Sequence, residues 1–177
     1  LEEKNIIFKT KSDTEVLLKL YELKGKKMLH GLEGMFAIAI WDKKKEVLFL
    51  ARDPYGIKPL YVAKHKKGYL FSSQVKSIIN TNEVSLNLDK IGVLSFYLFG
   101  NVIEPNTCFK NIFNLKSGHY CLISKKHGLK IHKYYDIKKF FDTKVSNRKL
   151  NNNFSNVVKQ SVQNSIKKHT IPDVPIG

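Results

Sequence analysis

The sequence has little arginine, little cysteine and few acidic residues. Of its 177 residues, 31 are lysine or arginine and 15 are aspartate or glutamate, and Arg52 and Arg148 are the only arginines. The formal net charge of +16 raises the question of a nucleic-acid partner. Proteins that read bases and phosphates favour arginine, whose planar guanidinium makes two parallel hydrogen bonds, whereas the lysines here are scattered through turns and helix faces. We therefore expect no nucleic-acid partner and interpret the lysines as solubilising residues.

The sequence also lacks the signals of membrane-spanning and exported proteins. It has no run of about 18 apolar residues, and no basic segment followed by an apolar one opens it. The two cysteines, Cys108 and Cys121, are predicted to be reduced core thiols, because nothing indicates an oxidising compartment. We expect a cytoplasmic protein without a membrane partner.

Residues 34–74 contain four short apolar runs separated by turn residues. The runs span 35–41, 46–51, 58–63 and 69–72. Polar turns separate the first run from the second and the third from the fourth, so each pair of runs predicts a β-hairpin. Because the runs are apolar at successive positions, both faces of the sheet are expected to be covered, which indicates a layered domain with a buried sheet.

The two hairpins are joined by the sequence Arg-Asp-Pro-Tyr-Gly-Ile-Lys-Pro at residues 52–59. Its two prolines and glycine predict a compact, rigid corner. Arg52 and Asp53 could be considered an acid–base pair, but a guanidinium cannot act as a base. We interpret them as an internal ion pair that stabilises the corner. His30, which has no acid or cysteine at a recognisable spacing, is interpreted as a turn or surface residue.

Two longer helices are expected on either side of this region. Ser12 and Glu15 predict a capping box at the start of a helix that ends near Gly25. Residues 87–89 predict the start of a second helix that continues to Gly100. The second helix is rich in aromatic and aliphatic side chains, so we expect it to be buried against the sheet.

Shorter elements and a last helix complete the expected order. Residues 74–79 predict a short helix, and residues 108–113 predict a short helical turn. The two runs within 115–137 predict a third hairpin. Residues 150–168 carry an apolar stripe at helical spacing, which predicts one long amphipathic helix that needs a partner to cover it.

These segments, in this order, resemble the glutamine-hydrolysing domain of asparagine synthetases, which are class II glutamine amidotransferases with an N-terminal nucleophile. The matching segments are FKTKSDTEVLLKLYELKG, LHGLEG, GMFAIAIWD, LFLARDPYGIKPLYV, YLFSSQVKSI and DVPIG. The resemblance implies an α+β fold. It implies a four-layer αββα sandwich of the N-terminal-nucleophile hydrolase type, incomplete here, followed by the first helix of an α/β synthetase domain.

The resemblance also implies the domain limits. Residues 1–136 would be the C-terminal part of the amidotransferase domain, residues 137–148 a linker, and residues 149–177 the start of the ATP-pyrophosphatase domain. The implied parent protein is an ATP-dependent ligase of asparagine biosynthesis that hydrolyses glutamine and transfers the ammonia to aspartate. Its cofactors would be ATP and Mg²⁺, its substrates glutamine, aspartate and ATP, and two copies are expected to form a homodimer.

Asp13 is the one candidate site residue. From the residues alone, it is a first-turn acid favoured by the helix dipole. In the family, the aspartate of this Ser-Asp-x-Glu motif binds the α-amino group of glutamine. The family's N-terminal cysteine, its Asn-Gly oxyanion contact, its upstream arginine and its glycine-rich ATP loop have no counterpart in this sequence. We therefore expect the chain alone to be inactive, with no catalytic, cofactor-binding or metal-binding residue.

Two other interpretations remain open. The parent protein could be a related amidotransferase with a different acceptor, such as a surface sugar or an antibiotic precursor. Alternatively, the chain could be a non-catalytic basic interaction module that kept the scaffold of an amidotransferase.

Overall fold

The computed structural model describes residues 7–10, 12–139 and 154–169. The chain forms two compact units, Leu1–Ile137 and Lys138–Gly177. No helix in the described part of the chain has the length and apolar character needed to cross a membrane.

The second unit contains helix α5 (Phe154–His169), which overlaps most of the helix predicted for residues 150–168. Its apolar side chains are exposed in the structure, as an amphipathic helix without a covering partner would be. Most of the predicted linker, residues 140–148, lies outside the described residues. The limits at residues 136 and 149 stay predictions.

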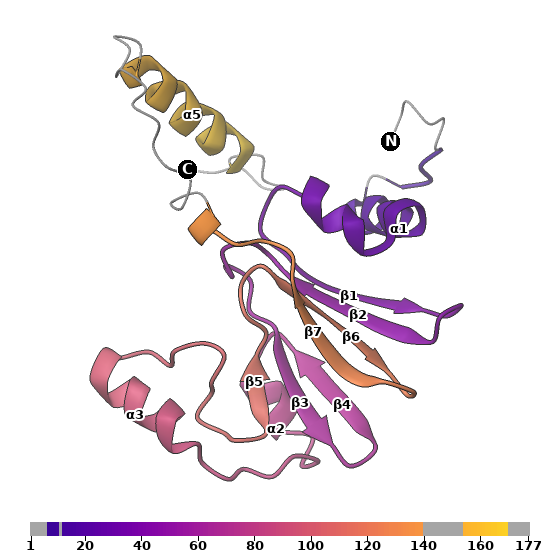
Figure 1. Cartoon of the computed structure of the whole chain (residues 1–177), viewed down its shortest axis with the longest axis vertical. Helices are drawn as coiled ribbons and strands as arrows, with labels where there is room; N and C mark the ends of the chain where they lie inside the picture. Colours follow the sequence, from indigo (N-terminus) through magenta and orange to yellow (C-terminus); the bar gives the residue numbers. More distant parts are fainter. Residues whose placement is uncertain (1–6, 11, 140–153, 170–177) are drawn as a thin grey trace. The chain divides into compact units, whose positions relative to one another are not determined.

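Two antiparallel sheets form the centre of the first unit (Figure 1). The four-stranded sheet has the order β1 (Ala37–Asp42), β2 (Val47–Arg52), β6 (His119–Ser124) and β7 (Gly128–Lys133). The three-stranded sheet has the order β4 (Gly68–Ser72), β3 (Tyr61–His65) and β5 (Ile112–Asn114). The three predicted hairpins are confirmed as β1–β2, β3–β4 and β6–β7.

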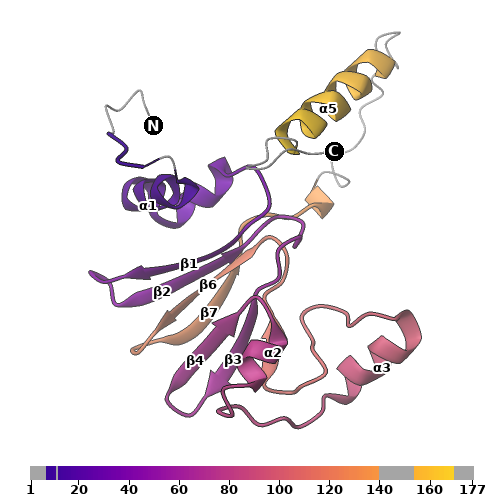
Figure 2. The same ribbon diagram turned by 180° about the vertical axis from the view of Figure 1, so that it is seen from behind.

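The helices of the first unit lie on the outer faces of the two sheets, except the last of them, which lies at the margin of the unit (Figure 2). They are α1 (Asp13–Lys24), the 3₁₀-helix η2 (Gly25–Gly31), α2 (Val75–Ile79) and α3 (Lys90–Phe99). α1 and η2 cover the four-stranded sheet, and α2 covers the three-stranded sheet. The layers therefore run helix, sheet, sheet, helix, which confirms the expected α+β sandwich.

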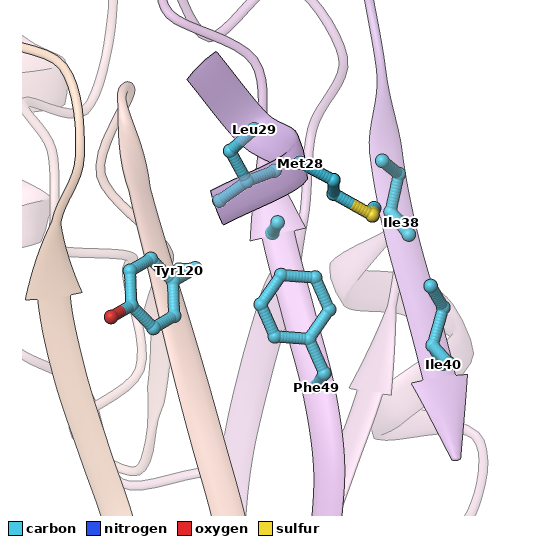
Figure 3. Close-up of a cluster of buried hydrophobic side chains, with 7 residues drawn as sticks. Met28, Leu29, Ile38, Ile40, Phe49 and Tyr120 are labelled. Carbon is cyan, nitrogen blue, oxygen red and sulfur yellow. The ribbon is translucent and has the colours of Figure 1, made fainter. Parts of the chain in front are cut away.

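Three apolar clusters hold these layers together. The first lies between η2, α1 and the four-stranded sheet, where Phe49 packs beside Tyr120 with ring centroids 5.6 Å apart (Figure 3). The second lies between the sheets and includes Leu50 and Val62, and the third joins Ile78 of α2 to the three-stranded sheet. Because successive side chains of a strand point to opposite faces, Phe49 and Leu50 place the central strand β2 in two clusters at once.

The expectation that both faces would be covered is wrong for β1. Its residues alternate between buried Ile38 and Ile40 and exposed Ala37, Ala39 and Trp41. β1 is an edge strand, and none of its residues belongs to the cluster between the sheets. The face of β1 formed by Ala37, Ala39 and Trp41 is therefore exposed although it is apolar.

The region after β4 differs from the prediction in two ways. The helix predicted between residues 87 and 100 is present as α3, but it is not buried against the sheet, since Gly92 and Ser95 are its buried residues. Residues 108–113 do not form a helical turn. Phe109 makes an isolated bridge to Leu88, and β5 pairs with β3. A short apolar run fits a helix or a strand equally well. Here residues 112–114 form a strand because they pair with the free edge of β3.

The predicted capping box is only half formed. Ser12 Oγ accepts a hydrogen bond from the Thr14 N–H at 3.2 Å, as an N-cap does. The carboxylate of Glu15, however, accepts from the N–H groups of Lys9 at 2.9 Å and Thr10 at 2.7 Å, not from Ser12. These bonds, the one from Lys9 first, lower the pKa of Glu15 and fasten the preceding segment to the helix.

Candidate functional site

The candidate site residue Asp13 borders a surface hollow of about 380 Å³. The hollow lies between the start of α1, the segment that leads into β1, and the corner at Lys58 and Pro59. Its walls are mostly apolar and include Leu17, Met35, Phe36, Ile38 and Pro59. Two hydroxyl-bearing residues, Thr14 and Ser73, also line it. Asp13 and Lys58 are the charged residues among those that line it.

Asp13 is exposed at the first position of α1. The N-cap bond of this helix is made by Ser12, so the Asp13 carboxylate is not needed for capping. Its polar neighbour is the Thr14 hydroxyl, which donates to Asp13 Oδ1 at 3.4 Å. The positive end of the helix dipole favours a carboxylate at this position. The carboxylate is therefore placed to meet a cation that enters the hollow.

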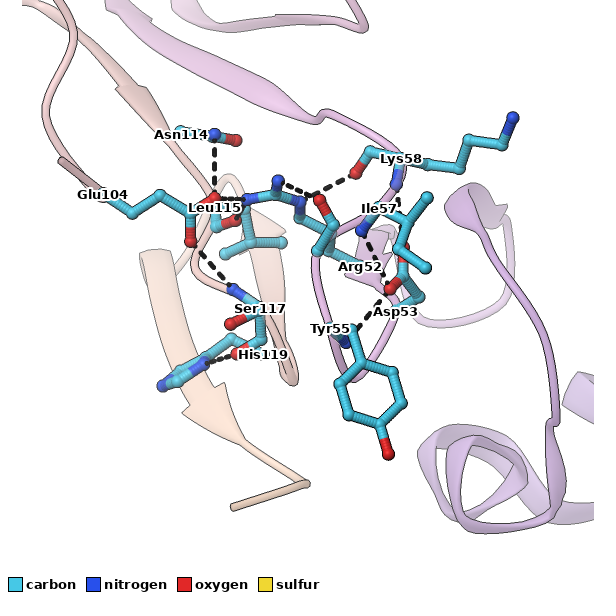
Figure 4. A network of polar contacts seen from close by, with 11 residues as sticks. Arg52, Asp53, Tyr55, Ile57, Lys58, Glu104, Asn114, Leu115, Ser117 and His119 are labelled. Atoms are coloured by element: carbon cyan, nitrogen blue, oxygen red, sulfur yellow. Dashed lines mark hydrogen bonds and ion pairs between the residues drawn. The ribbon is translucent and has the colours of Figure 1, made fainter. Parts of the chain in front are cut away.

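The corner behind Lys58 is built around the side chain of Asp53 (Figure 4). Asp53 is completely buried. Its Oδ1 accepts from the N–H groups of Tyr55 and Ile57, both at 3.1 Å, and its Oδ2 accepts from the Lys58 N–H at 3.0 Å. A buried carboxylate with three backbone donors fixes the course of the turn between the two prolines.

Arg52 does not pair with Asp53, so that prediction is wrong. Its guanidinium pairs instead with the carboxylate of Glu104. It also donates to the carbonyl oxygens of Lys58 at 2.7 Å, Gly56 at 2.6 Å and Leu115 at 2.7 Å. The physical reason is simple: neighbouring residues of an extended chain point in opposite directions, so the two side chains cannot meet.

Together the two side chains hold the main chain of Lys58 from both sides. Asp53 accepts from its N–H, and Arg52 donates to its carbonyl oxygen. Since Lys58 and Pro59 form one wall of the hollow, this network positions that wall. The sequence indicated a rigid corner, but no sequence pattern pointed to Glu104, which lies 52 residues further along the chain.

The other residues considered from the sequence lie away from the hollow. His30 is exposed and contacts the edge of the Tyr134 ring. Both cysteines are free thiols: Cys108 is partly buried, and Cys121 is fully buried. Burial raises the pKa of Cys121 to about 12. Within the described ranges, no three histidine, cysteine, aspartate or glutamate side chains gather as a metal site would require.

Comparison with known proteins identifies the family. A model of the glutamine amidotransferase domain matches residues 1–135. The chain is 31% identical over 175 residues to the glutamine-hydrolysing asparagine synthetase 3 of Bacillus subtilis, a match that covers 96% of this chain and 27% of that protein. It is 41% identical over 125 residues to asparagine synthetase 2 of the same organism, covering 68% of this chain and 17% of that protein.

A solved structure supports the fold. The allosteric regulatory enzyme of purine biosynthesis matches with a TM-score of 0.50 and 22% sequence identity over 75% of this chain and 24% of that one. The chain spans only about a quarter of the length of asparagine synthetase 3 of Bacillus subtilis. These matches confirm the resemblance to glutamine-hydrolysing asparagine synthetases. Because the domain model covers well over half of its residues, the chain belongs to the family of glutamine amidotransferase domains.

Proposed function

We propose that this chain is the glutamine-binding part of an ATP-dependent asparagine synthetase, in which ammonia released from glutamine is transferred to aspartate. The observation that carries the proposal is the position of Asp13 at the rim of the hollow, with the capping role taken by Ser12. In this proposal, residues 1–136 belong to the amidotransferase domain, residues 137–148 to a linker and residues 149–177 to the synthetase domain.

Asp13 would bind the α-ammonium group of glutamine. A carboxylate offers an ammonium group both a negative charge and hydrogen-bond acceptors. The apolar walls supplied by Leu17 and Phe36 would contact the two methylene groups of the substrate side chain. The network of Arg52 and Asp53 would keep the opposite wall in place.

The remaining parts of the reaction belong to the parent protein. ATP, Mg²⁺ and aspartate would bind outside the glutamine-binding part, and none of the described residues of this chain is assigned to them. The parent protein would be a cytoplasmic homodimer. The 177-residue chain alone is expected to release no glutamate from glutamine.

Kinetics of the full-length gene product test the proposal. Replacing Asp13 by asparagine removes a charge-assisted hydrogen bond, which is worth about 1.5–3 kcal/mol. The KM for glutamine should therefore rise by roughly tenfold to a hundredfold in an assay of glutamate release. Asparagine formation from added ammonium should stay unchanged, because it bypasses the glutamine site.

Glu22→Gln provides the matched control, because Glu22 is an exposed acid near the other end of the same helix. Its KM for glutamine should equal that of the unmodified protein. An unchanged KM in the Asp13→Asn variant would remove Asp13 from the site. A full-length protein that releases no glutamate from glutamine would refute the whole proposal.

A further inference from the structure

Helix α3 is apolar around its whole circumference, yet most of it faces solvent in the structure. Its sequence is KIGVLSFYLF, and Lys90 is its only charged residue. The exposed fractions of its large apolar residues are 68% for Ile91, 57% for Leu94, 53% for Phe96, 81% for Tyr97, 65% for Leu98 and 66% for Phe99. These six residues are called the α3 surface below. A helix that is apolar on all sides is normally found inside a larger protein core.

The α3 surface is of the size of the largest apolar patches that single proteins leave in water. Aromatic side chains offer roughly 150–250 Å² each for burial, so its three aromatic residues alone expose several hundred Å². The largest apolar patch of an ordinary monomer is about 300–600 Å². Apolar patches of this size are often contact surfaces.

The rest of the unit holds α3 firmly in this exposed position. Figures 1 and 2 show the helix at the margin of the unit, beyond the sheets. Its contact face consists of small residues, Gly92 and Ser95. A Cβ atom at Gly92 would lie 1.9 Å from the carbonyl oxygen of Thr107, so the helix lies directly against that backbone. Asp89 caps the helix by accepting from the Gly92 N–H at 2.8 Å. The exposed surface is therefore a preformed one.

Charge points in the same direction. The chain has 31 basic residues among 177, yet residues 91–103 contain no charged residue at all. A protein that uses lysine as its general solubilising residue has omitted it from this surface. The absence of charge means that a partner recognises α3 by apolar contact and shape, not by ion pairs.

We propose that the α3 surface docks into an apolar groove of a second domain of the same protein. The residues that form this groove lie outside residues 1–177. This inference rests on the proposed function, in which the chain is one part of a longer enzyme. Asparagine synthetase 3 of Bacillus subtilis, which matches 96% of this chain, has only 27% of its length in the match. The remaining length is enough for a domain that could provide such a groove.

The distribution of the side chains favours a groove over a second copy of α3. Residues two positions apart on a helix are rotated by about 200°, so Phe96 and Leu98 point to opposite sides. A symmetric pairing of two α3 helices would cover one stripe of each and leave the other side in water. A groove covers several sides of the helix at once.

Site-specific photo-cross-linking in the full-length gene product tests the docking. A benzophenone amino acid replaces Tyr97, and in a control it replaces Lys66, an exposed residue of the β3–β4 turn. We expect illumination to join position 97 to a peptide from outside residues 1–177 within the same molecule. On a denaturing gel the cross-linked protein should therefore run as a single chain, without an adduct of dimer size. The yield should be roughly tenfold higher than at position 66, because an interface core holds the probe against protein.

Three outcomes overturn the docking proposal. A dimer-sized adduct through position 97 would identify a second copy as the partner. Equal yields at positions 97 and 66 would show that α3 has no specific partner. A gene product without a further domain would leave no groove to bind. Glutamate release from glutamine is measured separately. The docking proposal can therefore be refuted without refuting the Asp13 site, and the Asp13 site can be refuted without refuting the docking proposal.

Discussion

Replacing Arg52 by leucine should strongly destabilise the first unit. The Arg52 side chain is 4% exposed, and its guanidinium donates to three carbonyl oxygens in addition to the Glu104 carboxylate. Leucine fills a similar volume but offers no donor. The three carbonyl groups would lose their partner inside the protein, and Glu104 would lose its counter-charge.

The expected cost follows from these losses. Removing one partner of a buried ion pair costs about 3–5 kcal/mol, because an uncompensated charge stays behind. The Glu104 side chain is 35% exposed, so water would stabilise part of its charge and the lower end of that range applies to the pair itself. The unsatisfied carbonyl groups add to the cost, and a loss of about 4 kcal/mol in the free energy of unfolding is expected.

A double-mutant cycle separates the pair from the carbonyl contacts. Urea unfolding of the 177-residue chain, followed by far-ultraviolet circular dichroism, gives the free energy of unfolding for Arg52→Leu, Glu104→Gln and the double variant. The coupling energy should be about 1–3 kcal/mol, as for residues in one hydrogen-bond network. Arg52→Lys keeps the charge but cannot reach all four acceptors, and it should still cost about 2 kcal/mol. A loss below about 0.5 kcal/mol for Arg52→Leu would refute the network.

Three further predictions concern other parts of the unit. Gly92→Ala should lower the free energy of unfolding by about 1–3 kcal/mol in the same urea assay, because the new methyl group meets backbone; an unchanged value would mean that α3 can shift freely. In the native protein, a thiol reagent should label Cys108 and leave Cys121 unreacted until denaturant is added, since burial raises the pKa of Cys121 to about 12; equal labelling rates would contradict this. The hydrogen bond from Lys45 lowers the pKa of Asp42 below its ordinary value of 3.8, so the stabilisation is present above that value and is lost as the pH falls through the folded-state pKa. In acid titrations, the Asp42→Asn variant should therefore lose less stability between pH 5 and pH 2 than the unmodified chain does. If the two proteins gave parallel curves of stability against pH, the ionised Asp42 carboxylate would not contribute to stability.

The elements that could be predicted from the sequence are those that depend on neighbouring residues. The hairpins follow from short apolar runs separated by polar turns, and the start of α1 follows from Ser12. The four-layer order follows from the family resemblance. The role of Asp13 in substrate binding stays a prediction, which its position at the hollow supports.

The errors at Glu15, Arg52 and residues 108–113 share one cause. In each case a local partner was available in the sequence, but a more distant one was closer in space. Glu15 binds the segment before the helix, Arg52 binds Glu104, and residues 112–114 pair with β3. Hydrogen-bonding groups that leave water need a partner, and tertiary structure, not sequence distance, determines which partner lies within reach.

The error at α3 has a different cause. Its apolar composition favours a covered helix, but composition does not identify the covering element. Ile78 of α2 and Val84 pack against the three-stranded sheet, so α2, and not α3, covers its outer face. The small residues Gly92 and Ser95 form the contact face of α3, and its large apolar residues are exposed. An apolar helix that its own unit has no room to bury is best explained by a partner, and this is why α3 is informative about the larger protein.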